Sequence, residues 1–394
     1  MYKITSIIWA FITLLTLYPY FIWENGYVLK ASFLTLIVFF FITIGKGIDR
    51  KVIVLFVLYL FWIIYGFLPR GDEISFVSTG VMLILLYILS SEQIKTNAFK
   101  YFRRMLMFVL LVSLLQYPII ALNFLEPIGQ ITPSSLIKLS RGQYYNNYIF
   151  NVILNDQYIQ VFGLNFFRFS SVFDEPGLVG TISAILLFTY DDRTDGKYFS
   201  LERKIYIISL ILSFSLGGYL LYILGVILNE VIEKRKSIKK YVVYVPMILS
   251  VAFLIFNSDA GEKYIIDRIW INGEFNLVSN RTDNQFNLIF DGFTQSSTRL
   301  IFGDGKDAHA RLGVDVSSYK GFLYNFGVIG ILYLALTMLY TALSFGRINI
   351  EMKILIFIIL VINTYQRPID FNYYYYFIFL SICMRKYNNG VKND

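Results

Sequence analysis

The sequence predicts an all-α polytopic membrane protein with about ten spans, a broken or re-entrant hairpin at residues 205–228 (11–12 helices in all) and two long external loops. Hydrophobic residues make up 56% of the 394 residues and charged residues 16%, too few charges to cover a soluble protein of this size. The apolar residues fall into blocks of roughly 14 to 24, about the length that crosses a hydrocarbon core. Lysine gathers in short loops between the blocks, which indicates membrane topology and not nucleic-acid binding.

The predicted spans follow one another with short linkers along most of the chain. They cover residues 4–23, 31–45, 52–68, 76–90, 105–125, 177–190, 241–257, 321–343, 354–365 and 371–384. Two linkers are long: external loop 1, residues 126–176, and external loop 2, residues 258–320. The first block has no small-residue cleavage site and is followed by more blocks, so we expect a retained span and not a signal peptide. Residues 1–394 are expected to form a single membrane domain.

The positive-inside rule predicts the orientation of these spans. With a cytoplasmic amino terminus, the inside segments hold 22 of the 35 Lys and Arg residues and 10 of the 27 Asp and Glu residues, and both long loops lie outside. This requires residues 205–228 to begin and end in the cytoplasm, because basic residues flank the block on both sides. Ser215-Leu-Gly-Gly218 interrupts its centre, where irregular backbone is tolerated if protein or a water-filled cavity covers it. One ordinary span with an atypical basic outer loop is the alternative.

Arginine is frequent among the basic residues of the external segments. These segments carry 8 arginines among 13 basic residues, whereas the inside segments carry 8 among 22. Lysine suffices for the inside rule, but arginine presents a planar fork of donors that binds phosphate in a bidentate way. The pattern indicates an external anion site; scatter of small numbers is the alternative.

A cation and two carboxylates precede the span that begins near residue 177. They lie in the string Arg168-Phe-Ser-Ser-Val-Phe-Asp174-Glu175-Pro176-Gly. Pro176 suits the start of a helix, and Asp174 is expected to be its N-cap. Arg168 and Glu175 are therefore candidate catalytic residues. The alternative is a capped helix start in which Arg168 pairs with Glu175.

External loop 2 combines charged side chains with glycines. Gly303-Asp304-Gly305 predicts a tight turn that presents polar groups. His309 is the only histidine of the chain, and imidazole titrates nearest to neutrality, so His309 is the natural candidate for a general base. A solvated loop histidine is the alternative. The candidate substrate-binding residues are Arg281, Arg311, Asp304, Arg367 and Asp315.

The tyrosines 373–376 begin the last predicted span. We expect them to form an interfacial aromatic belt, with sugar stacking as the alternative. A single histidine and the single Cys383 argue against a histidine or thiolate metal site. No metal and no other cofactor is expected.

Three strings in the chain resemble those of one membrane enzyme family. One is the string from Arg168 to Pro176, before a span. Another is Ser213-Phe-Ser-Leu-Gly-Gly, at a small-residue break. The third is Leu300-Ile-Phe-Gly-Asp-Gly, followed by Asn325-Phe-Gly-Val-Ile-Gly at the start of a span. Over roughly the stretch from the fifth to the last span, the chain looks like a Wzy-type O-antigen or surface polysaccharide polymerase, a relative of the O-antigen ligases. Many relatives carry arginine in the break, where this chain has leucine.

The resemblance implies glycosyl transfer at the outer face of a bacterial cytoplasmic (inner) membrane. The substrate would be an undecaprenyl-pyrophosphate-linked oligosaccharide in contact with membrane lipid, and a chain-length regulator protein is a candidate partner; no nucleic acid is expected. An acceptor hydroxyl would attack an anomeric carbon, and lipid pyrophosphate would leave. External arginines are the expected electrostatic stabilisers, Arg168 first, then Arg281 and Arg311. Glu175 or His309 would orient or deprotonate the acceptor.

Other function classes stay open at this point. The ligases often place a histidine just before the span that follows the large loop, where this chain has Asp315-Val-Ser-Ser318. This difference favours a polymerase over a ligase, and it makes Asp315 and Ser318 an alternative acceptor site to His309. A flippase or transporter of lipid-linked oligosaccharide would more often show repeat-related halves and charged residues within spans. An acyltransferase-like enzyme usually needs a histidine in or near a span.

Overall fold

The computed structural model describes most of the chain. The described residues are 2–23, 31, 35, 49–67, 79–133, 138–139, 142–161, 164–190, 199–232, 270–271, 274–275, 284–314, 316, 318–345 and 350–384. The predicted span 241–257, Arg281 and Asp315 lie outside them, as does nearly all of the predicted span 31–45. The chain divides into two compact units. Unit 1 comprises Met1–Leu106 and Thr282–Asp394, and unit 2 comprises Met107–Arg281.

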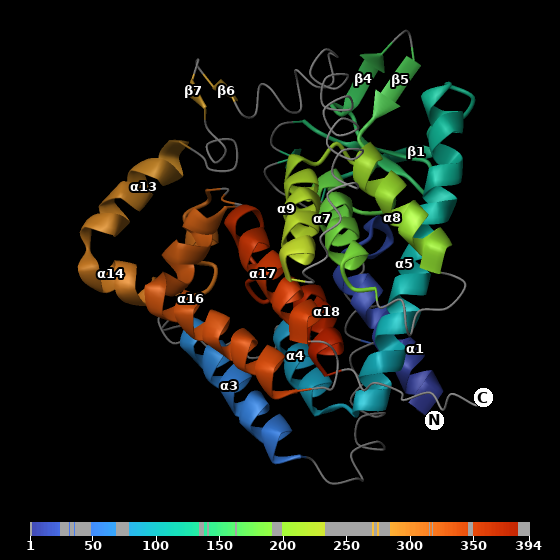
Figure 1. The fold of residues 1–394 in the computed structure, drawn as a ribbon. Helices are drawn as coiled ribbons and strands as arrows, with labels where there is room; N and C mark the ends of the chain where they lie inside the picture. Colours follow the sequence, from blue (N-terminus) through green and yellow to red (C-terminus); the bar gives the residue numbers. More distant parts are fainter. Residues whose placement is uncertain are drawn as a thin grey trace, which may run out of the picture. The chain divides into compact units, whose positions relative to one another are not determined.

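The described residues are mostly helical (Figure 1). Three helices are long and apolar enough to cross a membrane: α3 (Arg50–Phe67), α5 (Glu92–Ala121) and α16 (Tyr319–Ser344). The other apolar helices are shorter, namely α1 (Tyr2–Thr16), α4 (Thr79–Leu89), α7 (Pro176–Leu187), α9 (Leu216–Ile232) and α18 (Tyr373–Cys383). The structure thus shows helices that can span a membrane, but it does not confirm about ten spans.

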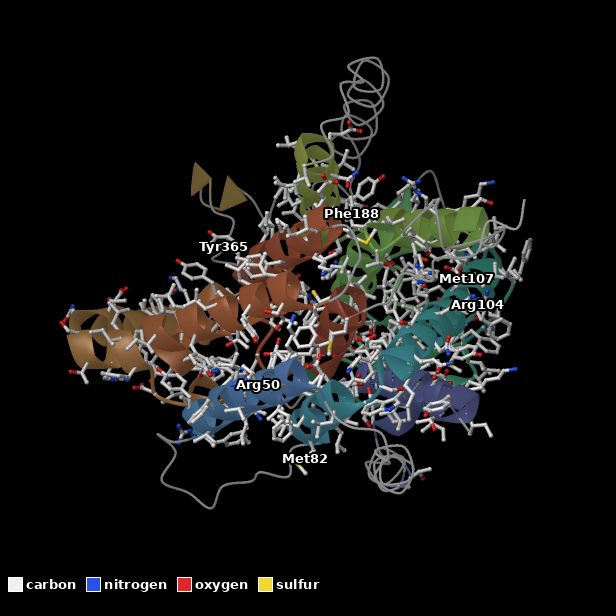
Figure 2. All side chains as sticks on the ribbon, turned by 60° about the horizontal axis from the view of Figure 1, so that its bottom comes forward. Arg50, Met82, Arg104, Met107, Phe188 and Tyr365 are labelled. Carbon is white, nitrogen blue, oxygen red and sulfur yellow. The ribbon has the colours of Figure 1, made fainter. Side chains whose placement is uncertain are left out.

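The long helices expose large apolar side chains on their outer faces. On α16, Val328, Leu332 and Leu336 recur every four residues, and their exposed fractions are 41%, 55% and 64%. Such spacing places them on one face of the helix. Phe61 of α3 and Leu115 of α5 are similarly exposed. Figure 2 shows side chains made mostly of carbon projecting from these helices. Extended apolar faces of this kind suit contact with lipid.

Two predicted spans have different bounds in the structure. Span 4–23 is not one helix, since α1 ends at Thr16 and a short 3-10 helix, η1 (Tyr20–Ile22), follows. Between them, Tyr18 adopts a φ of 59° immediately before Pro19, and a residue before proline is disfavoured in the helical region. The helix predicted at 105–125 begins earlier, at Glu92, where a carboxylate favours a helix amino terminus.

The predicted break within residues 205–228 is confirmed. Helix α8 (Phe199–Leu212) ends there and three residues separate it from α9, with Phe214 at a φ of 45°. Both helices pack against α7 and run in different directions from the break (Figure 1). Gly180 of α7 and Gly218 of α9 permit the close approach, because a Cβ on Gly218 would lie 2.8 Å from the carbonyl carbon of Gly180. That both ends of the block are cytoplasmic stays a prediction.

External loop 1 contains short antiparallel strands, so the chain is not purely α-helical. The first three are β1 (Gly129–Ile131), β2 (Tyr145–Asn147) and β3 (Val152–Leu154), in the order β1-β2-β3. A separate hairpin pairs β4 (Tyr158–Val161) with β5 (Leu164–Phe167). Valine, isoleucine and aromatic residues favour strands here, and the intervening asparagine, aspartate and glycine favour turns. Hydropathy patterning alone did not distinguish these strands from an irregular loop.

External loop 2 contributes elements to both units. In unit 2, β6 (Trp270–Ile271) pairs with β7 (Glu274–Phe275). In unit 1, α13 (Asn284–Gln295), α14 (Ser297–Phe302) and α15 (Ala308–Arg311) precede α16. A small apolar core joins this part of the loop to α16; its buried residues are Phe286, Phe290, Phe293, Ala308, Val314, Val316 and Tyr324. The core fixes the position of α15 beside α16.

Aromatic rings dominate the core of unit 1, where α17 (Ile350–Gln366) and α18 complete the packing. The ring of Trp62 on α3 lies 4.7 Å from that of Phe326 on α16 and 5.5 Å from that of Phe371, before α18. Its indole Nε1 donates to the Tyr376 hydroxyl at 3.2 Å. Each tyrosine of the run 373–376 is at most 8% exposed. The predicted interfacial belt is therefore wrong, because these rings are buried in the interior of unit 1.

Candidate functional site

Helix α16 is broken at Gly327, and a loop of the chain binds to the break. Gly327 has a φ of 62° and a ψ of −178°, which interrupts the helical hydrogen bonds. The backbone N–H groups of Asp304 and Gly305 donate to the carbonyls of Tyr324 and Asn325, at 2.9 and 2.8 Å. Irregular backbone in an apolar helix needs such replacement partners. The loop that leads to His309 is thereby joined to α16.

The turn predicted at Gly303-Asp304-Gly305 agrees with this geometry. Both glycines have positive φ, 75° and 92°, a region that glycine adopts without steric cost. A Cβ on Gly303 would lie 2.5 Å from the backbone nitrogen of Gly327. Glycine is required at this contact because the two backbones touch.

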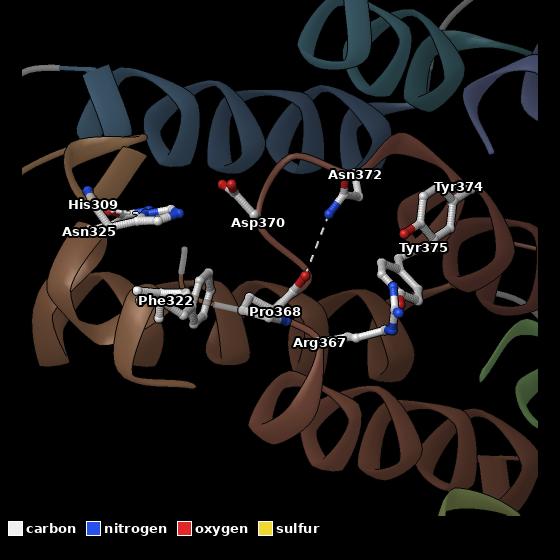
Figure 3. A pocket seen from close by; sticks show the side chains of 11 residues that line it. His309, Phe322, Asn325, Arg367, Pro368, Asp370, Asn372, Tyr374 and Tyr375 are labelled. Atoms are coloured by element: carbon white, nitrogen blue, oxygen red, sulfur yellow. Dashed lines mark hydrogen bonds between the residues drawn. The ribbon is translucent and has the colours of Figure 1, made fainter. Parts of the chain in front are cut away.

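A cavity of about 210 Å³ lies beside this junction. Its lining comes from α15, α16, the turn after α17, and α18 (Figure 3). The lining residues are His309, Val316, Gly321, Phe322, Asn325, Arg367, Pro368, Asp370, Asn372, Tyr374 and Tyr375. In Figure 3, His309 and Asn325 lie at one end, Arg367 and the tyrosines at the other, and Asp370 between them. Imidazole, guanidinium, carboxyl and aromatic groups thus share one space.

Asn325 holds the imidazole of His309. The Nδ1 atom of His309 lies 3.0 Å from the Asn325 Oδ1 atom, and the backbone N–H of His309 donates to the same oxygen at 3.3 Å. An amide oxygen only accepts hydrogen bonds, so Nδ1 carries a proton. In the neutral tautomer that this bond selects, the acceptor atom of His309 is Nε2.

Arg367 opens the turn between α17 and α18. Its backbone N–H donates to the Asn363 carbonyl at 2.7 Å, and its own carbonyl accepts from the Asn363 side chain at 3.0 Å. These two bonds fix the turn at its start. Of the predicted site residues, the structure brings His309 and Arg367 together on the cavity.

Asp370 ends the same turn and was not among the predicted site residues. The pKa of its carboxyl is raised to about 7, first by burial and then by the nearby Asp307. Lys306 and the backbone N–H of Phe371 act in the opposite direction. The signal in the sequence was an acidic residue between two apolar blocks, which sequence reasoning used only to locate an outer turn. Asn325, hidden at the start of a predicted span, was missed as well.

Two further predicted residues of external loop 2 contact each other away from the cavity lining. Asp304 forms an ion pair with Arg299, whose Nε donates to it at 3.0 Å. This pair raises the pKa of the guanidinium of Arg299. Arg311 donates through Nη2 to the backbone carbonyl of Asp304 at 3.1 Å. In the described structure Asp304 anchors the loop, and substrate binding by either residue stays a prediction.

In unit 2, Arg168 caps the break between α8 and α9. Its side chain is buried, with 6% of its surface exposed. Its Nε donates to the Ser213 carbonyl at 3.3 Å, and its Nη2 donates to the Phe214 carbonyl at 3.2 Å. The last carbonyls of a helix lack partners within it, so this guanidinium supplies them. A catalytic role for Arg168 stays a prediction.

The predicted N-cap of α7 is wrong by one residue. The N-cap is Glu175, without a side-chain cap hydrogen bond, and Pro176 begins the helix as expected. Asp174 instead accepts from Lys138 Nζ at 2.7 Å and from the hydroxyl of Tyr145. Burial and this carboxylate raise the pKa of Tyr145. A charged donor is a stronger hydrogen-bond partner than a backbone N–H, which explains why the Asp174 carboxylate binds Lys138 and does not cap the helix.

Within the described part of the chain, no group of three or more His, Cys, Asp or Glu residues could hold a metal ion. Comparisons of the chain with protein-family models, with curated proteins and with solved structures find no match.

Proposed function

We propose that the protein is a membrane glycosyltransferase, a polymerase that joins undecaprenyl-pyrophosphate-linked oligosaccharide repeat units into a surface polysaccharide. The reaction would take place at the outer face of a bacterial cytoplasmic membrane. The observation that carries the proposal is the cavity beside the broken helix α16, which combines Arg367, His309, Asp370 and aromatic rings. The resemblance of the three sequence strings to Wzy-type polymerases supports it.

Arg367 supplies what a departing pyrophosphate needs. As the glycosidic C–O bond breaks, negative charge builds on the phosphate oxygen, and a fixed cation stabilises that charge. A guanidinium also matches the paired oxygens of a phosphate through two parallel N–H donors. The backbone N–H and carbonyl of Arg367 are both hydrogen-bonded to Asn363, so the backbone that carries the guanidinium side chain is held in place.

The rest of the cavity suits a sugar residue. The rings of Phe322, Tyr374 and Tyr375 offer apolar faces, while Asn325 and Asn372 offer amide groups for hydroxyls. Ligand sites typically combine aromatic walls with a few placed polar groups. At about 210 Å³ the cavity admits a sugar ring and not a whole repeat unit. The remaining glycan and the lipid would extend outside it, beside the apolar faces of the long helices.

The test is reconstitution with a defined substrate. The purified protein in lipid nanodiscs receives a synthetic lipid-linked repeat unit, and the products are separated by size. We expect a ladder of oligomers and released lipid pyrophosphate. Arg50→Ala, at the start of α3 and outside the cavity lining (Figure 2), is the control and should give the same ladder.

Other outcomes would identify other functions. The polymerase proposal is wrong if the parent protein forms no product longer than one repeat unit. Transfer of the glycan to a lipid acceptor, without a ladder, would indicate a ligase. Movement of the unaltered lipid-linked glycan across a sealed vesicle membrane would indicate a flippase.

A further inference from the structure

The backbone of Asp370 has a left-handed conformation. Its φ is 39°, in a region that non-glycine residues seldom adopt and that aspartate tolerates better than most. The Tyr376 hydroxyl donates to the Asp370 carbonyl at 2.6 Å, and Trp62 donates to that hydroxyl. The aromatic core of unit 1 therefore fixes the backbone of Asp370 at the cavity.

One carboxyl oxygen of Asp370 has no hydrogen-bond partner among the described residues. This atom, Oδ1, is buried. Buried polar atoms are nearly always hydrogen-bonded, and a catalytic role or a bound ligand is one explanation of an exception. Because Asp370 lines the cavity, this oxygen is placed to accept a hydrogen bond from a ligand hydroxyl.

Burial and the neighbouring charges raise the pKa of Asp370 toward neutrality. Burial is the largest cause of its raised pKa, near 7, followed by Asp307; Lys306 opposes them from the same loop. His309 and Arg367 share the cavity with it. A carboxyl of this kind takes up a proton more readily than an exposed one, and a general base works best when its pKa lies near the working pH.

The side-chain partner of the His309 imidazole is an amide and not a carboxylate. Its Nδ1 is bonded to the neutral amide of Asn325, which orients the ring. In histidine bases of the triad type, a carboxylate performs that task. The arrangement favours His309 as a hydrogen-bond acceptor that positions a sugar hydroxyl.

We propose that Asp370 is the group that deprotonates the acceptor sugar, an inference that rests on the function proposed above. The acceptor oxygen forms a bond to the anomeric carbon of the donor as its proton passes to Asp370. The bond between that carbon and the phosphate oxygen breaks, and its electron pair leaves with the lipid pyrophosphate. The proton then returns to solvent. Carboxylates perform this proton transfer in many reactions at anomeric carbons.

The experiment compares pH profiles of turnover in nanodiscs with the lipid-linked repeat unit. The parent should gain activity as pH rises through about 7, where Asp370 ionises. Asp370→Asn should lower kcat by about 10²- to 10⁴-fold, with little change in KM, and should abolish that rise. His309→Gln should lower kcat less than about tenfold, an order-of-magnitude expectation for a lost positioning bond, and should keep the rise.

Two neighbours provide matched controls that move the profile in opposite directions. Lys306→Gln removes the positive charge that favours ionised Asp370, so the rise should shift to higher pH. Asp307→Asn removes a like charge, so the rise should shift to lower pH. Neither residue lines the cavity, and both variants should keep the maximal turnover.

The results separate this inference from the proposed function. A parent that forms polymer while Asp370→Asn retains its kcat within tenfold at pH 8, or keeps the rise, overturns the role of Asp370 and leaves the polymerase standing. A parent that forms no polymer overturns both. Loss of activity in Asp370→Asn can be distinguished from unfolding by its melting temperature. This should be no lower than that of the parent, because the substitution removes a buried charge that is unfavourable for folding.

Discussion

Arg168 in unit 2 and Asp370 in unit 1 are both charged residues placed away from water, yet their surroundings differ. The guanidinium of Arg168 donates to two backbone carbonyls at the end of α8. The carboxyl of Asp370 keeps a buried oxygen without a hydrogen bond from the described residues. Burial of a charge is unfavourable unless partners compensate it. The first residue is therefore integrated into its fold, whereas the second retains an interaction that a ligand can complete.

An arginine does not form a ligand site merely because it lies close to a predicted membrane surface. The sequence string around Arg168 ranked it first for phosphate binding, and Arg367 ranked lower. The structure places Arg367 on a cavity and Arg168 against a helix end. The two arginines should accordingly differ in what their loss affects, turnover for one and folding for the other.

Of the two arginines, Arg367 should have the larger effect on turnover when it is replaced by alanine. Loss of one preorganised group that stabilises the transition state lowers kcat by about 10²- to 10³-fold. We expect a loss of this size in the polymer assay, with normal expression and melting temperature. Arg367→Lys should recover part of the activity, because it keeps the charge and loses the fork. Unchanged polymer formation by Arg367→Ala would remove Arg367 from the site.

Arg168→Met should act on stability. Removing the guanidinium leaves the carbonyls of Ser213 and Phe214 without these donors, and each unsatisfied buried group costs about 1–3 kcal/mol. The expected signs are a lower melting temperature in detergent and lower expression, measured beside Arg367→Ala. A structural role for Arg168 is contradicted if Arg168→Met has the melting temperature of the parent and forms no polymer. In that case Arg168 acts on the substrate, as the sequence string predicted.

The smallest effect concerns pH and stability. The pKa of Asp370 is raised from 3.8 to about 7 in the folded protein, so between these values the folded state binds more protons than the unfolded state. Stability then falls as pH rises from about 4 to 7 and levels off above it. The melting temperature of the parent should fall by a few degrees between pH 5 and 8, and Asp370→Asn should flatten this dependence. An equal slope in both proteins would contradict the assignment.

Sequence patterning predicted the long apolar helices and the break near Ser215, because both depend on local composition. It did not predict the early end of α1, which depends on Tyr18 and Pro19, or the strands of external loop 1. Of the roughly ten spans that it predicted, three are helices long and apolar enough to cross a membrane in the described residues, where several other apolar blocks form shorter helices. Length of an apolar block and length of the helix inside it are separate quantities.

The candidate site was predictable only in pieces. His309 stood out by residue type, and Arg367 by its place in an outer turn. Asn325 and Asp370 were not assigned to the site from the sequence, because one lies in an apolar stretch and the other in a short turn. Their importance arises when α15, α16 and the turn before α18 meet at one cavity, a contact between segments far apart in the sequence.

The junction at Gly327 has a consequence for how the bilayer reaches the cavity. Beyond the break, α16 exposes Leu332 and Leu336, and helices adjust their tilt to bilayer thickness. At the break the same helix is bonded to the loop that carries His309. A change of tilt in α16 therefore displaces one wall of the cavity. Nanodiscs of short and long acyl chains should accordingly give different turnover in the polymer assay for one protein with one substrate, so that membrane thickness would control the proposed activity.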